Sequence, residues 1–362
     1  MRPRLLHPIG ALLLTTALAL ASPVAALAGT DPPPANAGQA VQAGAPPNDD
    51  NGTRIVDGAP AQRGELPWMV ELAYYHPGTS SSPSWYAHEC GAALIAPQWL
   101  LTAAHCVTGP TSPGAIAWKL SPTKGADRGP THAIAGSVVQ GDTTAAAWRS
   151  ALAFDARHVF VPKTYTPVTD HAFAHDDVAL IHLTRAAPHD RPVIHPVFDL
   201  DRSKYPQTDG SVRLSGWGAT SEQTKAQGIV SPDLRVADLQ LLAPQDCETQ
   251  TLGRYPAAQG SSFPRSVICA GPRTGALATT VARGATEAGK HADACRGDSG
   301  GPLVRQLSGA YIVTGVASFE LVCGGGAALY TNVAEFSGWI EDTIKANGGP
   351  GAPAIGLGRR RQ

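Results

Sequence analysis

The sequence predicts an all-β domain closed by one helix, and two observations carry that prediction. Between Ile55 and about Asn347, short apolar runs alternate with clusters of Gly, Pro, Ser and Asp, which is typical of short strands joined by turns. One stretch near the end of this region has helical spacing instead. The strand candidates are rich in β-branched, aromatic or leucine side chains, and the clearest are Trp68–Ala73, Gly91–Ile95, Val178–Leu183, Val212–Gly216 and Tyr311–Ser318.

The single predicted helix covers Glu335–Ala346. Its large apolar side chains recur at the spacing that places them on one helical face, and they are Phe336, Trp339, Ile340 and Ile344. The tail that follows, residues 348–362, is rich in Gly and Pro and contains three consecutive arginines. We expect this tail to be flexible.

Composition limits the classes of partner. The chain has 362 residues, of which 43% are apolar and 16% charged, so it can bury a large core. Its formal net charge is −1, which disfavours nucleic acid or an anionic membrane as the main partner. We therefore expect a protein or peptide partner, and a monomer.

The first residues predict the compartment. Arg2 and Arg4 precede an apolar run from Ile9 to Ala21, and Ala26–Ala28 offers the small-x-small pattern that signal peptidase reads. The alternative is a membrane anchor, but a bilayer needs about 20 apolar residues and this run is shorter. Residues 1–28 are therefore interpreted as a signal peptide, and the protein as secreted or, in a Gram-negative source, periplasmic.

A leader and the cysteines fit that compartment. Residues 29–54 contain many Pro, Gly, Ala and Asn and almost no large apolar residue, which predicts a disordered segment. The six cysteines are an even number without a Cys-x-x-Cys pair, which favours disulfides over a zinc or redox site. Three disulfides are expected, and the sequence by itself allows about fifteen pairings.

Three motifs carry the components of acyl transfer, which needs a nucleophile, a base and an acid that orients the base. They are Thr102–Cys106 (TAAHC), Asp177–Leu180 (DVAL) and Gly297–Pro302 (GDSGGP). The glycines of the third motif allow the amides of Gly297 and Ser299 to point at one oxyanion. Together the motifs resemble those of the trypsin and chymotrypsin family of serine proteases, over about four fifths of the chain.

The resemblance implies a fold and a set of catalytic roles. The expected fold is two packed six-stranded Greek-key β-barrels with a C-terminal helix, spanning residues 55–347 with a boundary near residues 190–205. Ser299 corresponds to the nucleophile, His105 to the general base and then acid, and Asp177 to the orienting carboxylate. Asp176 is the alternative to Asp177, which is preferred because it directly precedes Val178.

The resemblance also assigns the cysteines and an activation switch. The implied disulfides are Cys90–Cys106, Cys247–Cys269 and Cys295–Cys323. Cleavage between Arg54 and Ile55, by a trypsin-like protease or by the enzyme itself, would free an ammonium group that pairs with Asp298. A buried carboxylate without a partner is costly, so the new ammonium has a reason to insert. His88 either restrains Asp298 before cleavage or is a buried histidine bonded to the backbone.

The substrate pocket is implied by Asp293, Ser318 and Glu320. Asp293 lies six residues before Ser299, where trypsin-like relatives carry the acid that pairs with a substrate Arg or Lys; the alternative is a solvated loop acid. Glu320, Val322 and Ala328 depart from the family pattern, and their side chains could narrow or roof the pocket. Glu320 either adds a second attraction for cations or excludes long side chains. Ser215–Gly218 and Trp339 also match the family and are interpreted as packing residues.

No cofactor and no metal are expected. His171 and His175 form a candidate metal pair, but no Glu follows the first histidine as it does in zinc proteases. The spans 107–176 and 271–291 predict long surface loops that could select substrates. Two other functional classes stay open: a secreted binding protein that has lost turnover, and an esterase that uses the same three residues.

Overall fold

The computed structural model describes residues 55, 58–76, 85–108, 132–135, 151–153, 159–167, 174–184, 186–187, 194–196, 210–247, 264–272, 292–307, 310–320, 323–324 and 326–348. The predicted signal peptide, the leader with Arg54, His171, Val322 and residues 349–362 lie outside these ranges. Contacts divide the chain into Met1–Val41 and Gln42–Gln362, and every described residue belongs to the second unit.

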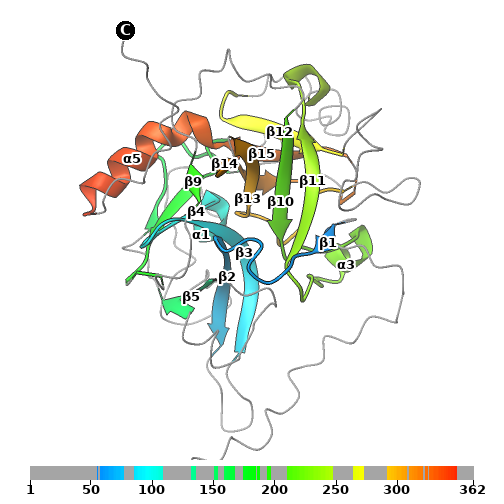
Figure 1. The fold of residues 1–362 in the computed structure, drawn as a ribbon, viewed down its shortest axis with the longest axis horizontal. Helices are drawn as coiled ribbons and strands as arrows, with labels where there is room; N and C mark the ends of the chain where they lie inside the picture. The colour runs from blue at the N-terminus through cyan, green and yellow to red at the C-terminus, as the bar shows by residue number, and fades with distance from the viewer. Residues whose placement is uncertain are drawn as a thin grey trace, which may run out of the picture. The chain divides into compact units, whose positions relative to one another are not determined.

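The described chain is mostly strands, as predicted (Figure 1). One sheet has the order β6-β5-β2-β3-β4-β8-β7. Its strands are β2 (Met69–His76), β3 (Trp85–Ala96), β4 (Trp99–Thr102), β5 (His132–Ala135), β6 (Ala151–Ala153), β7 (Val159–Phe160) and β8 (Ala179–His182).

The other sheet closes into a barrel, because β11 pairs with both β10 and β12 and the ring runs β11-β10-β13-β14-β15-β12. In Figure 1 these strands run in colour from green β10 to orange β15. The strands of this sheet are β1 (Ala59–Pro60), β9 (His195–Pro196), β10 (Ser211–Gly216), β11 (Arg235–Leu241), β12 (Val267–Gly271), β13 (Pro302–Leu307), β14 (Ala310–Phe319) and β15 (Ala328–Asn332). The expected chymotrypsin-like fold is confirmed.

Helices are few and short among the described residues. α1 (Ala104–Val107) and α3 (Glu222–Ala226) are single turns, and the 3₁₀ helix η5 (Val333–Phe336) leads into α5 (Ser337–Ala346). The helix predicted at Glu335–Ala346 is therefore present with a 3₁₀ first turn, and α1 and α3 were not predicted. None of the described helices is long and apolar enough to cross a membrane.

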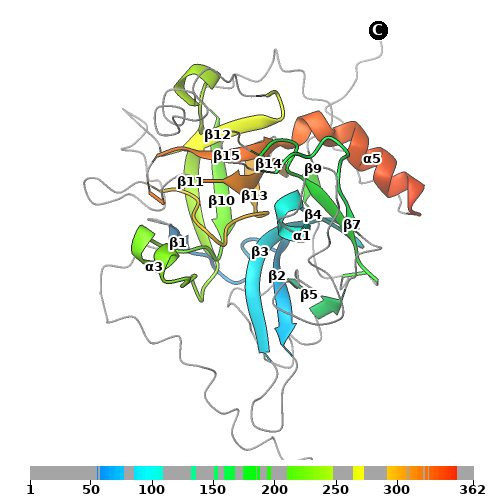
Figure 2. The same cartoon turned by 180° about the vertical axis from the view of Figure 1, so that it is seen from behind.

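Burial explains the position of α5, which is the red helix in Figure 2. Its residues Ile340 and Ile344 have no exposed surface and belong to the same core cluster as Leu94, Leu101 and Leu180 of β3, β4 and β8. Fully burying an isoleucine side chain contributes about 1.5–3 kcal/mol. The C-terminal helix is thus held by burial of its apolar face in this cluster, which also contains residues of the second sheet.

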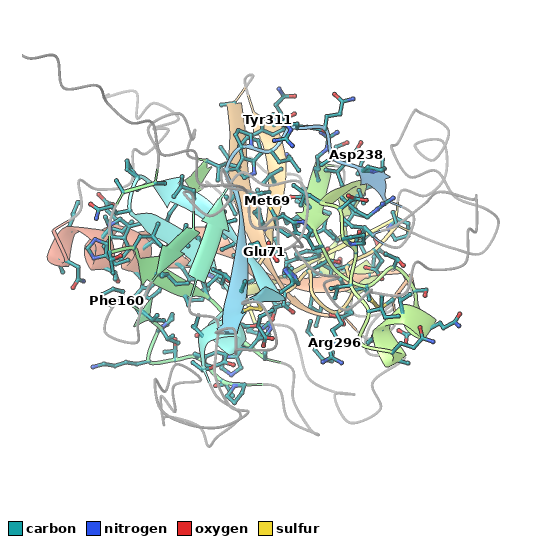
Figure 3. All side chains as sticks on the ribbon, turned by 90° about the horizontal axis from the view of Figure 1, so that it is seen from below. Met69, Glu71, Phe160, Asp238, Arg296 and Tyr311 are labelled. Atoms are coloured by element: carbon teal, nitrogen blue, oxygen red, sulfur yellow. A yellow bond between two sulfur atoms is a disulfide. The ribbon has the colours of Figure 1, made fainter. Side chains whose placement is uncertain are left out.

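Contacts between the two sheets place the site. Ser215 on β10 donates a hydrogen bond to the Met69 sulfur on β2 at 3.1 Å, and the rings of Trp68 and Tyr311 lie 5.1 Å apart. Met69 and Tyr311 are labelled in Figure 3. The backbone N–H of Gly91 on β3 donates to the Ser299 carbonyl at 2.8 Å. The predicted nucleophile therefore lies against a strand of the first sheet.

Candidate active site

Strand pairing brings His105 and Asp177 together from 72 positions apart in the chain. β4 pairs with β8 so that Thr102 is opposite Ala179. His105 follows shortly after β4, on α1, and Asp177 directly precedes the Val178 that leads into β8. The Asp177 carboxylate accepts from the His105 backbone N–H at 2.9 Å and lies 2.7 Å from the ring Nδ1.

The protonation of His105 follows from that contact. An ionised carboxylate only accepts hydrogen bonds, so Nδ1 carries the hydrogen of the neutral ring and Nε2 carries its lone pair. The His105 side chain is 34% exposed, whereas Asp177 is 1% exposed. Nε2 is therefore the nitrogen that can take a proton from a substrate-facing nucleophile.

Asp177 is ionised although it is buried. Burial opposes the charged form, but the charge and hydrogen bonds of His105 and a hydrogen bond from Ser318 outweigh it, so the pKa of Asp177 lies below its usual value. Ser318 Oγ donates to the carboxylate at 2.6 Å, and Thr331 Oγ1 donates to the Asp177 carbonyl at 2.7 Å. Ser318, which the sequence assigned to the substrate pocket, thus contacts the orienting acid, and Thr331 was not predicted.

The alternative acid, Asp176, faces elsewhere. Its carboxylate lies 3.8 Å from the ring of His175, which is 40% exposed. Asp176 also has a φ of 58°, in the left-handed region. The structure brings Asp177, not Asp176, to His105.

The loop around Ser299 contains the two amides that the resemblance assigns to an oxyanion site. Gly297 has a φ of 100°, which side-chain-bearing residues rarely adopt. Among the described residues, neither the Gly297 nor the Ser299 amide donates a backbone hydrogen bond, so both N–H groups remain for a ligand. Arg296, the neighbour of Gly297 that Figure 3 labels, is exposed.

Asp298 is buried beside the nucleophile. Its carboxyl oxygens accept from the N–H groups of Gly218 at 2.8 Å and Cys295 at 2.9 Å. A Cβ atom at Gly218 would collide with this carboxyl group, so the predicted packing motif makes room for Asp298. Burial is the largest cause that raises the pKa of Asp298, to about 7, and the charge of Glu320 adds to it. Ile55 is also fully buried, in the apolar core of the barrel formed by β10 to β15.

His88 lies against the same loop. Its Nε2 donates to the Gly297 carbonyl at 2.8 Å, and its Nδ1 lies 3.3 Å from the Glu71 carboxylate. Burial disfavours the charged form of His88, but Glu71 and the carbonyl outweigh it and raise the pKa above its usual value. Glu71, labelled in Figure 3, is a buried acid on β2 that sequence reasoning missed.

Asp293, the predicted base of the substrate pocket, is a buried acid. It is 1% exposed, and its Oδ1 accepts from the Ala294 N–H at 2.8 Å. Its Oδ2 and the hydroxyl of buried Tyr330 are polar atoms with no hydrogen-bond partner among the described residues. Burial, with a contribution from the charge of Glu320, raises the pKa of Asp293 well above its usual value. Such orphaned buried groups are costly unless a ligand satisfies them.

Sequence reasoning did not single out Tyr330. The available signal was the alternation along β15, which puts Ala328 and Tyr330 two residues apart on one face of the strand. Both side chains belong to the apolar core of the barrel formed by β10 to β15, together with Ala292, Ala294 and Ala317. Burial raises the pKa of the Tyr330 hydroxyl well above its usual value, and the charge of Asp293 adds to that shift.

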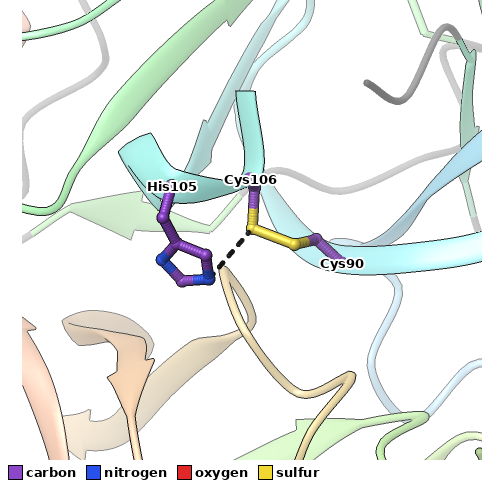
Figure 4. Close-up of side chains that lie close together, drawn as sticks. All are labelled: Cys90, His105 and Cys106. Carbon is purple, nitrogen blue, oxygen red and sulfur yellow. Dashed lines mark hydrogen bonds between the residues drawn. A yellow bond between two sulfur atoms is a disulfide. The ribbon is translucent and has the colours of Figure 1, made fainter. Parts of the chain in front are cut away.

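The three disulfides join the pairs that the resemblance implied: Cys90–Cys106, Cys247–Cys269 and Cys295–Cys323. Figure 4 shows the first of them beside His105, whose Nε2 lies 3.8 Å from the Cys106 sulfur. Cys90, His105 and Cys106 place three potential metal ligands within 4.8 Å of one another. A cysteine binds zinc as a thiolate, and the sulfurs of Cys90 and Cys106 are joined in a disulfide. These residues therefore do not fit a metal.

Comparisons with known proteins agree with this geometry. The family model described as Trypsin matches residues 55–340. The chain is 28% identical over 298 residues to CLIP domain-containing serine protease B4 of Anopheles gambiae, covering 80% of this chain and 70% of that protein. It is 29% identical over 304 residues to Transmembrane protease serine 9 of Rattus norvegicus, covering 83% of this chain but only 23% of that protein.

Proposed function

The chain belongs to the trypsin family of serine endopeptidases, and from this premise we propose that it is secreted as a zymogen and cleaves proteins after arginine or lysine. The observation that carries the specificity is the buried Asp293 carboxyl group, whose Oδ2 lacks a partner among the described residues. A basic substrate side chain would satisfy that oxygen with a charge-assisted hydrogen bond.

The proposed chemistry uses Ser299, His105 and Asp177. The Ser299 hydroxyl attacks the scissile carbonyl carbon, and its proton passes to Nε2 of His105. Asp177 holds the ring in the tautomer that accepts this proton and stabilises the imidazolium that forms. His105 then gives the proton to the leaving amine, and water repeats the sequence on the acyl-enzyme.

The oxyanion of each tetrahedral intermediate would accept hydrogen bonds from the Gly297 and Ser299 amides. The left-handed conformation of Gly297 and the His88 contact to its carbonyl support this role, because both fix the orientation of the loop. Preorganised donors of this kind contribute about 3–4 kcal/mol each to the transition state.

The test of specificity is a panel of fluorogenic peptides ending in Arg, Lys, Phe or Ala, assayed with protein cleaved at Arg54. We expect cleavage of the Arg and Lys peptides and its loss on Asp293→Asn, because a neutral amide no longer pairs with the cation. Ser299→Ala is the control for contaminating proteases. Preference for Phe or Ala would overturn the basic specificity. Cleavage of esters alone would favour the esterase alternative, and turnover of neither class would favour the binding protein.

The zymogen proposal depends on Asp298. Burial raises the pKa of Asp298 to about 7, so the hydrogen bonds to its carboxylate do not fully offset the cost of burying the charge. An ammonium group freed at Ile55 would supply a compensating charge and hold the Ser299 loop in its active conformation. The three disulfides support an oxidising compartment, either extracellular or periplasmic.

Arg54→Gln tests activation directly. We expect the variant to stay inactive after treatment with trypsin, because no Ile55 ammonium is released, whereas the treated wild type gains peptidase activity. N-terminal sequencing of the active wild type should begin Ile-Val-Asp-Gly. Full activity of the variant with its leader attached would contradict the switch.

A further inference from the structure

A chain of charged contacts links helix α3 to the wall of the pocket. Lys225 on α3 lies 3.6 Å from the Glu320 carboxylate and 3.3 Å from Glu222 on its own helix. The Glu222 carboxylate in turn accepts from the Cys323 backbone N–H at 2.6 Å. Helix α3 therefore contacts the predicted pocket wall at two points, Glu320 and Cys323. The second point is fixed by the Cys295–Cys323 disulfide.

Helix α3 is a firm support for Lys225 although it has a single turn. Ser221 accepts from the Thr224 N–H at 3.1 Å, and Thr224 Oγ1 accepts from the Ser221 N–H at 3.0 Å. This reciprocal cap satisfies two N–H groups that the helix itself leaves unpaired. The Lys225 ammonium is therefore presented to Glu320 from a fixed backbone.

Glu320 interacts electrostatically with both the predicted pocket acid and the predicted catalytic histidine. It directly follows β14, and its side chain is 15% exposed. Its charge interacts with Asp293 and with His105. Burial is the main cause that raises the pKa of Glu320, and Lys225 is the first group that opposes that shift. A substrate cation on its way to Asp293 therefore comes within the range of the Glu320 charge.

We propose that Lys225 masks Glu320 in the empty pocket, and that the basic side chain of a substrate takes the place of Lys225 as the partner of Glu320. Lys225 would then be a specificity-determining positioning residue, acting through Glu320. This inference rests on the proposed basic specificity, because it requires a cation at Asp293.

The exchange of Lys225 for a substrate cation costs the protein little and gives the substrate a second partner. Lys225 is 24% exposed and keeps Glu222 as a partner, so it loses little when it releases Glu320. The substrate cation gains a second carboxylate in a partly desolvated site, where charge-assisted hydrogen bonds are strong. Two acids close together and without a cation disfavour each other's ionisation, which is the condition that Lys225 relieves in the empty pocket.

The probe is p-aminobenzamidine, an aromatic amidine, whose dissociation constant is measured by fluorescence on the active enzyme. Lys225→Met should tighten binding about threefold to tenfold, because Glu320 loses its internal cation. Glu320→Gln should weaken binding. In the double variant, Lys225→Met should have no effect, because there is no longer a carboxylate to mask.

The controls separate masking from general structural effects. Lys345→Met removes a lysine of a more exposed ion pair, with Glu341 on α5, and should leave the dissociation constant unchanged. Lys225→Arg keeps the cation and should bind like the wild type, and thermal unfolding of every variant checks that the fold is intact.

The failures of the two proposals differ. Equal tightening by Lys225→Met in both backgrounds would mean direct repulsion of the ligand and would overturn the inference, as would unchanged or weaker binding. In these cases the basic pocket is still supported if the wild type binds the amidine and the Asp293→Asn variant does not. If the wild type does not bind the amidine at all, the basic pocket and the inference fail together.

Discussion

At the scale of single residues, the site depends on how buried acids find partners. The Asp177 carboxylate accepts three hydrogen bonds, two from His105 and one from Ser318, and its pKa is lowered. Among the described residues, Asp293 and Asp298 have only backbone donors, and the pKa of each is raised, first by burial. The first acid is satisfied within the protein, and in the proposed function the other two receive a cation from a substrate and from a new chain terminus.

Asp177→Asn should lower turnover by about 10⁴, because the amide stabilises the wrong tautomer of His105 while the geometry stays intact. The measurement is the turnover number on an Arg peptide. Asp176→Asn is the matched control, since its carboxylate faces His175, and it should leave turnover within about twofold of the wild type. If the neighbour shows the larger loss, the assignment of the orienting acid is wrong by one residue.

At the scale of secondary structure, the pairing of β4 with β8 brings His105 and Asp177 together, and the buried face of α5 belongs to the same apolar cluster as those strands. The helix is amphipathic: Ile340 and Ile344 are buried, whereas Lys345 and Glu341 form an exposed pair. Its contribution therefore comes from apolar packing in this cluster, because exposed pairs of this kind add at most about 1 kcal/mol.

Ile344→Ala should destabilise the protein by about 2–4 kcal/mol, because it removes buried methyl groups and leaves a cavity. The measurement is the free energy of unfolding in urea, made in the Ser299→Ala background to prevent self-digestion. Lys345→Ala, at the adjacent position on the exposed face, should cost less than about 1 kcal/mol. Similar losses for both would mean that α5 is not held by its apolar face.

At the scale of the whole domain, function depends on groups that lie between the two sheets. Gly91 and His88 of the first sheet contact Ser299 and Gly297 of the second, while Thr331 of the second holds Asp177 of the first. Neither sheet alone contains the site. Asp298 is the buried charge at the centre of this region, so its protonation should be coupled to folding.

Asp298 should make the stability of the uncleaved protein depend on pH. Because its folded pKa is raised from 3.8 to about 7, its contribution is fully present below its unfolded pKa and is lost as pH rises through about 7. The difference is at most on the order of 4 kcal/mol. Urea unfolding of the uncleaved Ser299→Ala protein at pH 5 and 8 measures it.

The companion variant Asp298→Asn isolates this residue from Asp293, whose raised pKa acts in the same direction. We expect the variant to lose less stability between pH 5 and 8 than the parent protein. Cleavage at Arg54 should also reduce the dependence, because an ammonium group keeps the carboxylate ionised. Equal losses in parent and variant would show that Asp298 does not titrate in this range.

The sequence by itself determined the fold class, five of the strands and the closing helix, and it predicted the residues that carry the chemistry, because alternation, helical spacing and the three motifs are local patterns. It also determined the disulfide pairs once the family resemblance was available. Local patterns cannot show which side chains meet across sheets, so Glu71, Thr331 and Tyr330 were found only in the fold. The tertiary structure also decided between Asp176 and Asp177, because only strand register fixes which carboxylate reaches His105. The contact of Lys225 with Glu320 joins segments 95 positions apart, and it follows from folding rather than from either segment.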